Sequence, residues 1–218
     1  AHELRTPVAA ILGFIETLRS SQVSPDKQQL FLERAYTQAN RLNELVDDIS
    51  LLNKIDENKD YYNFEDVNVK EVISEAKGSF SAVIDEKKIM VTVLVDENLK
   101  IKANRSLLFS VFHNLFDNAI KYGGDNLDIK IENYLEDEQY YYFSFSDNGQ
   151  GVPETHLARL FERFYRVDSG RSRKTGGTGL GLAIVKNAVQ LHKGEISVRN
   201  KKDGGLEFLF NLPKEAKS

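Results

Sequence analysis

The sequence predicts an α+β protein, in which an antiparallel two-helix hairpin is followed by an α/β sandwich. Apolar residues recur every three or four positions from Leu4 to Leu52, which is the spacing of amphipathic helices. Further along the chain, alternating strand-like runs interleave with helical ones, and 12 of the 14 glycines fall between Gly123 and Gly205. The polar run 56–60 separates the two patterns, so we expect domains at 1–58 and 59–218.

The first domain is predicted to be two long helices joined by a turn at 20–26, with the second helix over 27–58. Since one hairpin cannot cover the apolar stripes of both helices, a symmetric dimer that forms a four-helix bundle is the natural completion. A hairpin packed on its own downstream domain is the alternative. The stripes consist of Leu4, Val8, Ile11, Ile15 and Leu18 on the first helix and Phe31, Ala35, Leu42, Leu45, Ile49 and Leu52 on the second.

Only Ala1 precedes His2, although a helix is already under way at that point. We therefore expect an N-terminally truncated domain, cut from a longer protein, in which upstream turns of the first helix are missing. A shortened seam and a frayed helix end predict weak dimerisation.

The second domain is predicted to interleave helices with strands. Helices are expected over 69–87 and 106–122, and a third runs from the glycine-rich stretch 176–184 to near Lys193. Because no strict strand–helix repeat is present, a sandwich is favoured over a doubly wound sheet. Strands are expected around 91–95, 100–103, 127–131, 141–145, 196–198 and 206–212.

Composition disfavours several classes of protein. The net charge of −4 argues against a general nucleic-acid binder. The absence of cysteine excludes disulfides, thiolate metal sites and cysteine nucleophiles. No apolar run approaches the ~18–20 residues that a membrane helix needs, so we expect no membrane segment in this sequence.

Two asparagines of the 106–122 helix, Asn114 and Asn118, are one turn apart and project from the same edge. Lys121 and Tyr122 follow at the helix end. An amide oxygen and nucleotide phosphates form a suitable ligand set for magnesium, and lysine supplies a point charge for phosphate. A polar helix edge that is satisfied by its neighbours is the alternative.

Asp147 has the same parity as Phe143 and Phe145, so its carboxylate should end the inner face of a strand. A buried carboxylate needs hydrogen-bond donors, and the amino group of adenine is one such donor. Gly149 and Gly151 follow in the next turn. An ordinary strand-ending Asn-Gly turn is the alternative.

The segment 159–174 combines aromatic residues with six cations, which suits a lid over an anion; a solvated loop is the alternative. The following glycine-rich run, 176–184, leads into a helix whose backbone N–H groups can hold phosphate. Neither the dinucleotide fingerprint nor the Walker loop is present.

The first helix should expose His2, with Glu3 adjacent and Thr6 one turn later, away from the apolar stripe. A neutral imidazole beside a carboxylate can act as a nucleophile. A solvated histidine near a chain end is the alternative.

These stretches, taken in order, resemble the sequence boxes of bacterial sensor histidine kinases. Residues 1–7 (Ala-His-Glu-Leu-Arg-Thr-Pro) are similar to the phosphoacceptor box. The resemblance spans essentially the whole chain. It implies a truncated dimerisation and phosphoacceptor domain at 1–58 and a catalytic domain of the Bergerat type at 59–218. The N, G1, F and G2 boxes are matched by 113–122, 147–151, 160–168 and 176–184.

The resemblance implies that His2 is phosphorylated from ATP and that the phosphoryl group passes to an aspartate of a response regulator. Glu3 would orient the imidazole and take its proton, and Glu3 with Thr6 would serve a phosphatase activity toward the regulator. The missing helical turns predict poor autophosphorylation. The full-length protein is expected to be anchored in the bacterial inner membrane, with these domains in the cytoplasm.

ATP and Mg²⁺ are the cofactors that the resemblance implies. Asn118 matches the principal metal ligand and Asn114 assists it, while Asp147 matches the residue that reads the adenine amino group. The remaining nucleotide contacts match Lys121, Tyr122, Gly149, Gly151, Phe161, Arg163, Phe164, Arg166, Gly177, Thr178, Gly179, Leu180 and Gly181.

Two competing interpretations stay open. ATPases of the gyrase, mismatch-repair and heat-shock chaperone types use a glutamate base where Asn114 stands, and an amide cannot take a proton from water. A degenerate kinase would serve instead as a dimeric ATP-binding scaffold.

Overall fold

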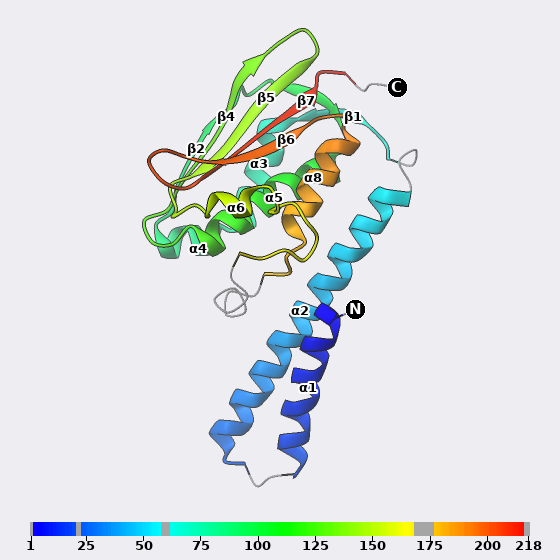
Figure 1. The fold of residues 1–218 in the computed structure, drawn as a ribbon, viewed down its shortest axis with the longest axis vertical. Helices are drawn as coiled ribbons and strands as arrows, with labels where there is room; N and C mark the ends of the chain where they lie inside the picture. Colours follow the sequence, from blue (N-terminus) through cyan, green and yellow to red (C-terminus); the bar gives the residue numbers. More distant parts are fainter. Residues whose placement is uncertain (1, 21–22, 58–61, 168–176, 216–218) are drawn as a thin grey trace. The chain divides into compact units, whose positions relative to one another are not determined.

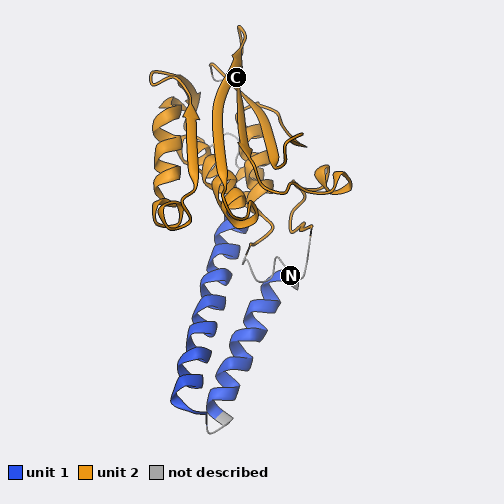
Figure 2. Cartoon of the chain, turned by 90° about the vertical axis from the view of Figure 1, so that its left-hand side faces the viewer, with its two compact units in different colours: residues 1–51 blue, residues 52–218 orange. Residues whose placement is uncertain are grey.

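The computed structural model describes residues 2–20, 23–57, 62–167 and 177–215. The chain divides into two compact units, residues 1–51 and 52–218 (Figure 2). The last turns of the second long helix, from Leu52 to Glu57, belong to the second compact unit. The division expected at 58 and 59 therefore stays a prediction.

The first unit is built from two long helices, α1 (His2–Ser20) and α2 (Pro25–Glu57), and the end of α2 continues into the second unit (Figure 1). Pro25 begins α2 at the first helical position, where its missing N–H leaves no bond unmade. The turn is consequently shorter than the expected 20–26, because Ser20, Pro25 and Asp26 are helical. No helix in the described part of the chain is both long and apolar enough to cross a membrane.

The two helices of the first unit contact each other through aromatic rings. Phe14 of α1 stacks on Phe31 of α2, with 5.9 Å between the ring centroids. Large apolar side chains nevertheless remain exposed on both helices. They are Val8, Leu12, Ile15, Leu30, Leu32, Tyr36 and Val46.

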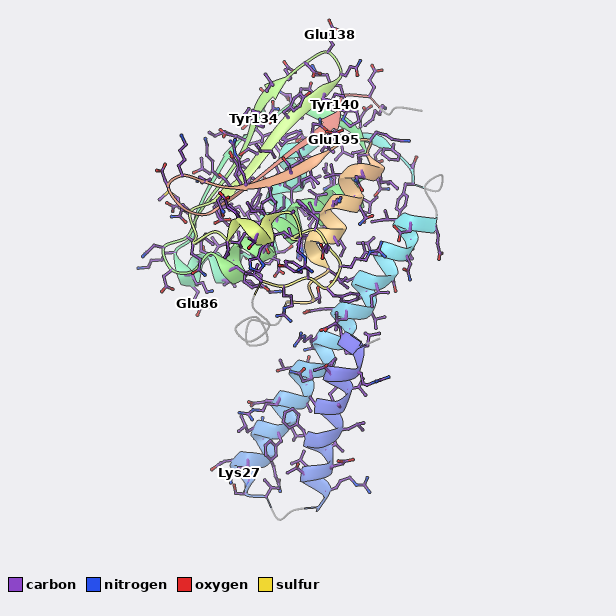
Figure 3. The ribbon with its side chains drawn as sticks, viewed as in Figure 1. Lys27, Glu86, Tyr134, Glu138, Tyr140 and Glu195 are labelled. Atoms are coloured by element: carbon purple, nitrogen blue, oxygen red, sulfur yellow. The ribbon has the colours of Figure 1, made fainter. Side chains whose placement is uncertain are left out.

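The second unit contains a five-stranded sheet in the order β2-β4-β5-β7-β6. Strand β2 is parallel to β4, whereas the other neighbours are antiparallel. Glu138 marks the tip of the β4–β5 hairpin, and Tyr134 and Tyr140 lie on its two strands (Figure 3). The strands are β2 (Met90–Leu94), β4 (Asp128–Glu136), β5 (Tyr140–Asp147), β6 (Ile196–Asn200) and β7 (Leu206–Pro213).

Helices α3 (Val69–Gly78), α5 (Arg105–Tyr122) and α8 (Gly181–Leu191) cover one face of this sheet (Figure 1). The Phe116 ring of α5 meets Phe145 of β5 edge-on at 5.2 Å, and both side chains are fully buried. The alternation along β5 therefore points Phe143 and Phe145 at the helices, and the expected sandwich is confirmed.

The helix expected over 69–87 is wrong as a single element. It is broken into α3 and α4 (Ser81–Lys87), since α3 ends at Gly78 and the N–H of Ser79 caps it by bonding to Glu75 O. Phe80 leaves the helical path and packs on His113, with 4.8 Å between ring centroids. Tertiary packing overrides the continuous helical pattern here.

A second, two-stranded sheet pairs β1 (Glu65–Asn68) with β3 (Lys100–Ala103) in antiparallel fashion. The sequence predicts β3 but misses β1, because four residues that begin with two acids carry little strand signal.

Candidate nucleotide site

Asp147 ends β5 with its side chain buried, as its parity predicted. Its Oδ1 accepts the backbone N–H of Gly149 at 2.8 Å and that of Leu206 at 3.3 Å. Burial raises the pKa of the Asp147 carboxyl above its ordinary value, while the two backbone N–H groups and Lys201 oppose that rise. The result is a desolvated carboxylate with both backbone donors on one oxygen, which suits the recognition of a donor on a ligand.

The two glycines after Asp147 are required by close approaches. A Cβ on Gly149 would lie 2.8 Å from Gly123 Cα and 2.9 Å from Asp147 Oδ1. Gly151 has a φ of +66°, and a Cβ there would lie 2.5 Å from Asn200 Oδ1. The loop 147–151 thus packs closely against both the end of α5 and the end of β6.

The end of β6 and the β6–β7 turn hold this loop, and this contact was not predicted from the sequence. Asn200 bonds to both backbone groups of Val152, and Lys201 Nζ donates to the carbonyl oxygen of Asp147 at 3.2 Å. Gly205 has a φ of +87°, and a Cβ there would overlap the same carbonyl oxygen. The pair Gly204-Gly205 between two alternating runs is the signal that could have located a close-packed turn.

Helix α5 presents the four polar residues that were predicted from its sequence. Asn114 and Asn118 are both half-buried, and Asn114 Nδ2 donates to Ser110 O at 2.8 Å. Lys121 Nζ pairs with Asp117 Oδ2 at 2.7 Å, which restrains the ammonium group near the helix end. Tyr122 is 40% exposed.

The glycine-rich stretch packs on this edge of α5. A Cβ on Gly181 would lie 2.6 Å from Asn114 Oδ1, and one on Gly177 would lie 2.6 Å from the Tyr122 hydroxyl oxygen. Thr178 Oγ1 accepts the N–H of Leu180, the residue that precedes the first turn of α8. The start of α8 and the amide edge of α5 are therefore side by side.

Two aromatic residues of the segment 160–168 contact different elements. Phe161 contacts β7, and Phe164 contacts the glycine-rich stretch. Phe161 packs edge-on against Phe208 of β7, with 6.3 Å between ring centroids. Phe164 has a φ of +65°, and its N–H donates to Gly179 O at 2.7 Å. This bond joins the two ends of the intervening segment, of which residues 168–176 lie outside the described residues.

The two arginines of this segment differ in their surroundings. Arg163 Nη2 pairs with Asp56 Oδ2 at 2.7 Å, so its guanidinium contacts the last turn of α2 within the second unit. Arg166 is half-buried. The phosphate-stabilising role expected of both arginines stays a prediction.

The residues predicted to take part in phosphoryl transfer belong to the first unit. His2 is the first residue of α1, and its side chain lies outside the described residues. Glu3 is half-buried and Thr6 is exposed on the same helix.

The remaining histidines are all engaged in the second unit. The His156 ring bonds to the Tyr165 hydroxyl, and His113 packs between Phe80 and Phe109. His192 is buried, accepts the backbone N–H of Asn104 at Nε2 and bonds to Ala188 O through Nδ1. Burial lowers the pKa of both His113 and His192.

Comparison with known proteins agrees with this geometry. The sequence model of the "Histidine kinase-, DNA gyrase B-, and HSP90-like ATPase" family matches residues 103–216, which is more than half of the chain. The chain belongs to this ATPase family. A second model, that of the "His Kinase A (phospho-acceptor) domain", matches residues 1–58. The two matches together identify the chain as the core of a two-component sensor histidine kinase.

Individual relatives support the same assignment for the kinase core. "Sensor-like histidine kinase SenX3" of Mycolicibacterium smegmatis is 32% identical over 213 residues, which is 98% of this chain and 55% of that protein. "Phosphate regulon sensor protein PhoR" of Pseudomonas aeruginosa is 35% identical over 209 residues, 95% of this chain and 47% of that protein. The chain therefore spans about half the length of these curated relatives.

Solved structures resemble the kinase core in fold. Histidine kinase AdeS of Acinetobacter baumannii aligns with a TM-score of 0.81 at 24% identity, over 98% of each chain. Histidine kinase ThkA, in complex with response regulator protein TrrA, aligns with a TM-score of 0.77 at 26% identity, over 98% of this chain and 59% of that one.

Proposed function

We propose that this kinase core binds ATP in the space bordered by α5, the start of α8 and the Asp147 loop, and transfers the γ-phosphoryl group to His2. The observation that carries the proposal is the buried carboxylate of Asp147. It lies at the end of β5, in the same domain as helix α5 with its edge of amide side chains. A site that reads adenine at one end and holds phosphate at the other suits ATP.

The two ends of the nucleotide would be held by different groups. Asp147 would accept the amino group of adenine, and Gly149 and Gly151 would allow the base to approach the backbone. Lys121 and the N–H groups at the start of α8 would face the phosphates, with Gly177, Thr178, Gly179, Leu180 and Gly181 forming the phosphate-side wall. Tyr122, Phe161, Phe164, Arg163 and Arg166 would complete the enclosure of the nucleotide.

The donor set on α5 fits magnesium bound mainly through the nucleotide. The described residues include no group of three or more His, Cys, Asp or Glu side chains that could hold a metal ion. Asn118, assisted by Asn114, would instead supply hard amide oxygens beside the phosphates. A bound Mg²⁺ supplies charge neutralisation of the phosphoryl oxygens.

The proposed transfer is a direct displacement by the His2 imidazole. A ring nitrogen forms the N–P bond to the γ-phosphorus while the bond from that phosphorus to the β,γ-bridging oxygen breaks, and ADP leaves. Glu3, the next residue of α1, would take the imidazole proton. Glu3 and Thr6 would also serve the reverse activity, in which Thr6 orients a water that attacks the phosphorylated aspartate of the regulator.

We further propose two protein partners for the full-length protein. The similarity to ThkA, which was solved with its response regulator protein TrrA, supports a receiver domain as the acceptor of the phosphoryl group. The exposed apolar side chains of α1 and α2 support a homodimer in which two hairpins form a four-helix bundle. From the resemblance to bacterial sensor histidine kinases, we also propose that the full-length protein is anchored in the inner membrane and that its kinase core is cytoplasmic.

Labelling of the full-length protein with Mg²⁺ and γ-labelled ATP tests the proposal. We expect label that is lost in acid and retained in base, and its absence in Asn118→Ala. Label on Asn118→Ala at the wild-type level would overturn the assignment of the metal side of the site. Nucleotide binding without any label on the wild-type protein would favour a non-catalytic, ATP-binding scaffold.

A further inference from the structure

The turn between β6 and β7 contacts the adenine-side loop at several points that are far apart in sequence. Asn200 bonds to Val152, Lys201 to the Asp147 backbone, and Leu206 to the Asp147 side chain. We propose that Asn200 is a positioning residue for base recognition, which acts by holding the loop 147–152 so that Asp147 faces the adenine. This inference rests on the proposed ATP site.

Asn200 contacts Val152 through both ends of its amide. Its Nδ2 donates to Val152 O at 2.7 Å, and its Oδ1 accepts the Val152 N–H at 3.0 Å. One planar side chain therefore satisfies both polar groups of a loop residue, as a neighbouring strand would. The pair is part-buried, so water replaces it poorly when the side chain is removed.

Gly151, the residue before Val152, leaves space for the Asn200 amide. Gly151 has a φ of +66°, and a Cβ there would lie 2.5 Å from Asn200 Oδ1. The Asn200 amide thus occupies the place where any other residue at 151 would put its side chain. This close approach fixes the end of the loop relative to β6.

The other end of the loop is fixed by the same turn. Leu206 and Gly149 donate their N–H groups to Oδ1 of Asp147, and Lys201 donates to its carbonyl oxygen. Both backbone N–H groups donate to Oδ1. Oδ2 is therefore the carboxylate oxygen that we expect to accept a hydrogen bond from the amino group of adenine. Its direction depends on where the β6–β7 turn lies against the loop.

Loss of Asn200 should therefore affect one end of the nucleotide only. Asp147 remains part of β5, while Gly151 and Val152 lose the amide that holds them. The proposed phosphate end is built from α5 and the start of α8, whereas the side-chain hydrogen bonds of Asn200 in the described part of the chain are to Val152. Selectivity for the base should fall more than affinity for the triphosphate. A purely structural role would weaken both in proportion.

The test compares ATP with inosine triphosphate, whose base carries a carbonyl oxygen where adenine has its amino group. Affinities of both magnesium nucleotides are measured by calorimetry for wild type, Asn200→Ala and Asn200→Asp. Asn200→Asp keeps the acceptor for the Val152 N–H but places a carboxylate oxygen against Val152 O. Asn211→Ala is the matched control, because Asn211 Oδ1 accepts the Glu195 N–H at 2.7 Å in the same sheet, away from the loop.

We expect wild type to prefer ATP on the order of tenfold or more, since inosine lacks the amino group that would donate to the charged Asp147 acceptor and presents a carbonyl oxygen to it instead. Asn200→Ala should lower this preference at least threefold while binding of inosine triphosphate stays near wild type. Asn200→Asp should lower it too, and Asn211→Ala should leave it unchanged. A wild-type preference retained in both Asn200 variants would overturn the positioning role. A wild type that binds both nucleotides equally, or neither, would instead refute the proposed adenine site itself. If Asn200→Ala does not fold, Asn200→Asp alone decides.

Discussion

Replacing Asp147 by asparagine should separate the stability of the second domain from its affinity for ATP. The carboxylate is 5% exposed, and burial raises its pKa above the ordinary value of 3.8. The native state therefore holds this proton more tightly than the unfolded chain does. The resulting penalty on stability grows as the pH rises from 3.8 through the native pKa, and it is fully present above the native pKa. An asparagine carries no charge and escapes this penalty, while its Oδ1 can still accept the Gly149 and Leu206 N–H groups.

The same substitution should cost affinity, because the carboxylate oxygen that we propose to face the base becomes an NH₂ group. A hydrogen bond to a charged acceptor contributes about 1.5–3 kcal/mol. Its loss should raise the dissociation constant for ATP roughly 10- to 150-fold. The unfolding free energy at pH 7 should stay within about 1 kcal/mol of wild type or rise. Asp147→Ala should behave differently, since it leaves two buried N–H groups without an acceptor at about 1–3 kcal/mol each.

Urea unfolding at pH 7 and calorimetric titration with ATP measure the two quantities on the same preparations. The reasoning is refuted if Asp147→Asn unfolds as easily as Asp147→Ala, or if it binds ATP as tightly as wild type. The first outcome would mean that the carboxylate charge stabilises the loop. The second would mean that Asp147 does not read the base.

Three further substitutions test other parts of the structure. Phe116→Ala should lower the unfolding free energy by about 3–5 kcal/mol in urea, because it empties a fully buried site against Phe145; a loss below about 1 kcal/mol would contradict that packing. Burial lowers the pKa of His192 below 6.5, so the native state disfavours its proton and the unfolding free energy should fall as the pH drops below 6.5. His192→Gln should therefore remove part of the difference in urea midpoint between pH 7.5 and pH 5.5. An unchanged difference would argue against this role of His192. Thr6→Ala should slow dephosphorylation of the cognate regulator about tenfold or more and leave autophosphorylation near wild type; equal phosphatase rates would remove Thr6 from that role.

Periodicity was sufficient to predict most elements of the fold. The alternation that ends at Asp147 correctly placed its carboxylate on the inner face, because a strand has a strict period of two. The break between α3 and α4 could not be read in the same way. The break depends on the packing of Phe80 against His113, and this contact joins residues more than thirty positions apart.

The site shows the same division. Asn114, Asn118 and Lys121 could be placed together from the sequence because a helix fixes which side chains share an edge, and their role in binding stays a prediction. Asn200 and Lys201 were not, since their roles arise from pairing between β7 and β5, which brings the β6–β7 turn to a loop some fifty residues earlier. Side chains that support a site through tertiary contacts carry no local pattern that marks them.

The most direct test is the location of the phosphoryl group after the full-length protein is incubated with Mg²⁺ and γ-labelled ATP. Wild type is compared with His2→Gln and with variants of the other three histidines, His113→Gln, His156→Gln and His192→Gln, each with ATP binding measured in parallel. Acid-labile label on every nucleotide-binding variant except His2→Gln is the predicted result. Label that persists in His2→Gln would contradict the assignment of His2 as the acceptor.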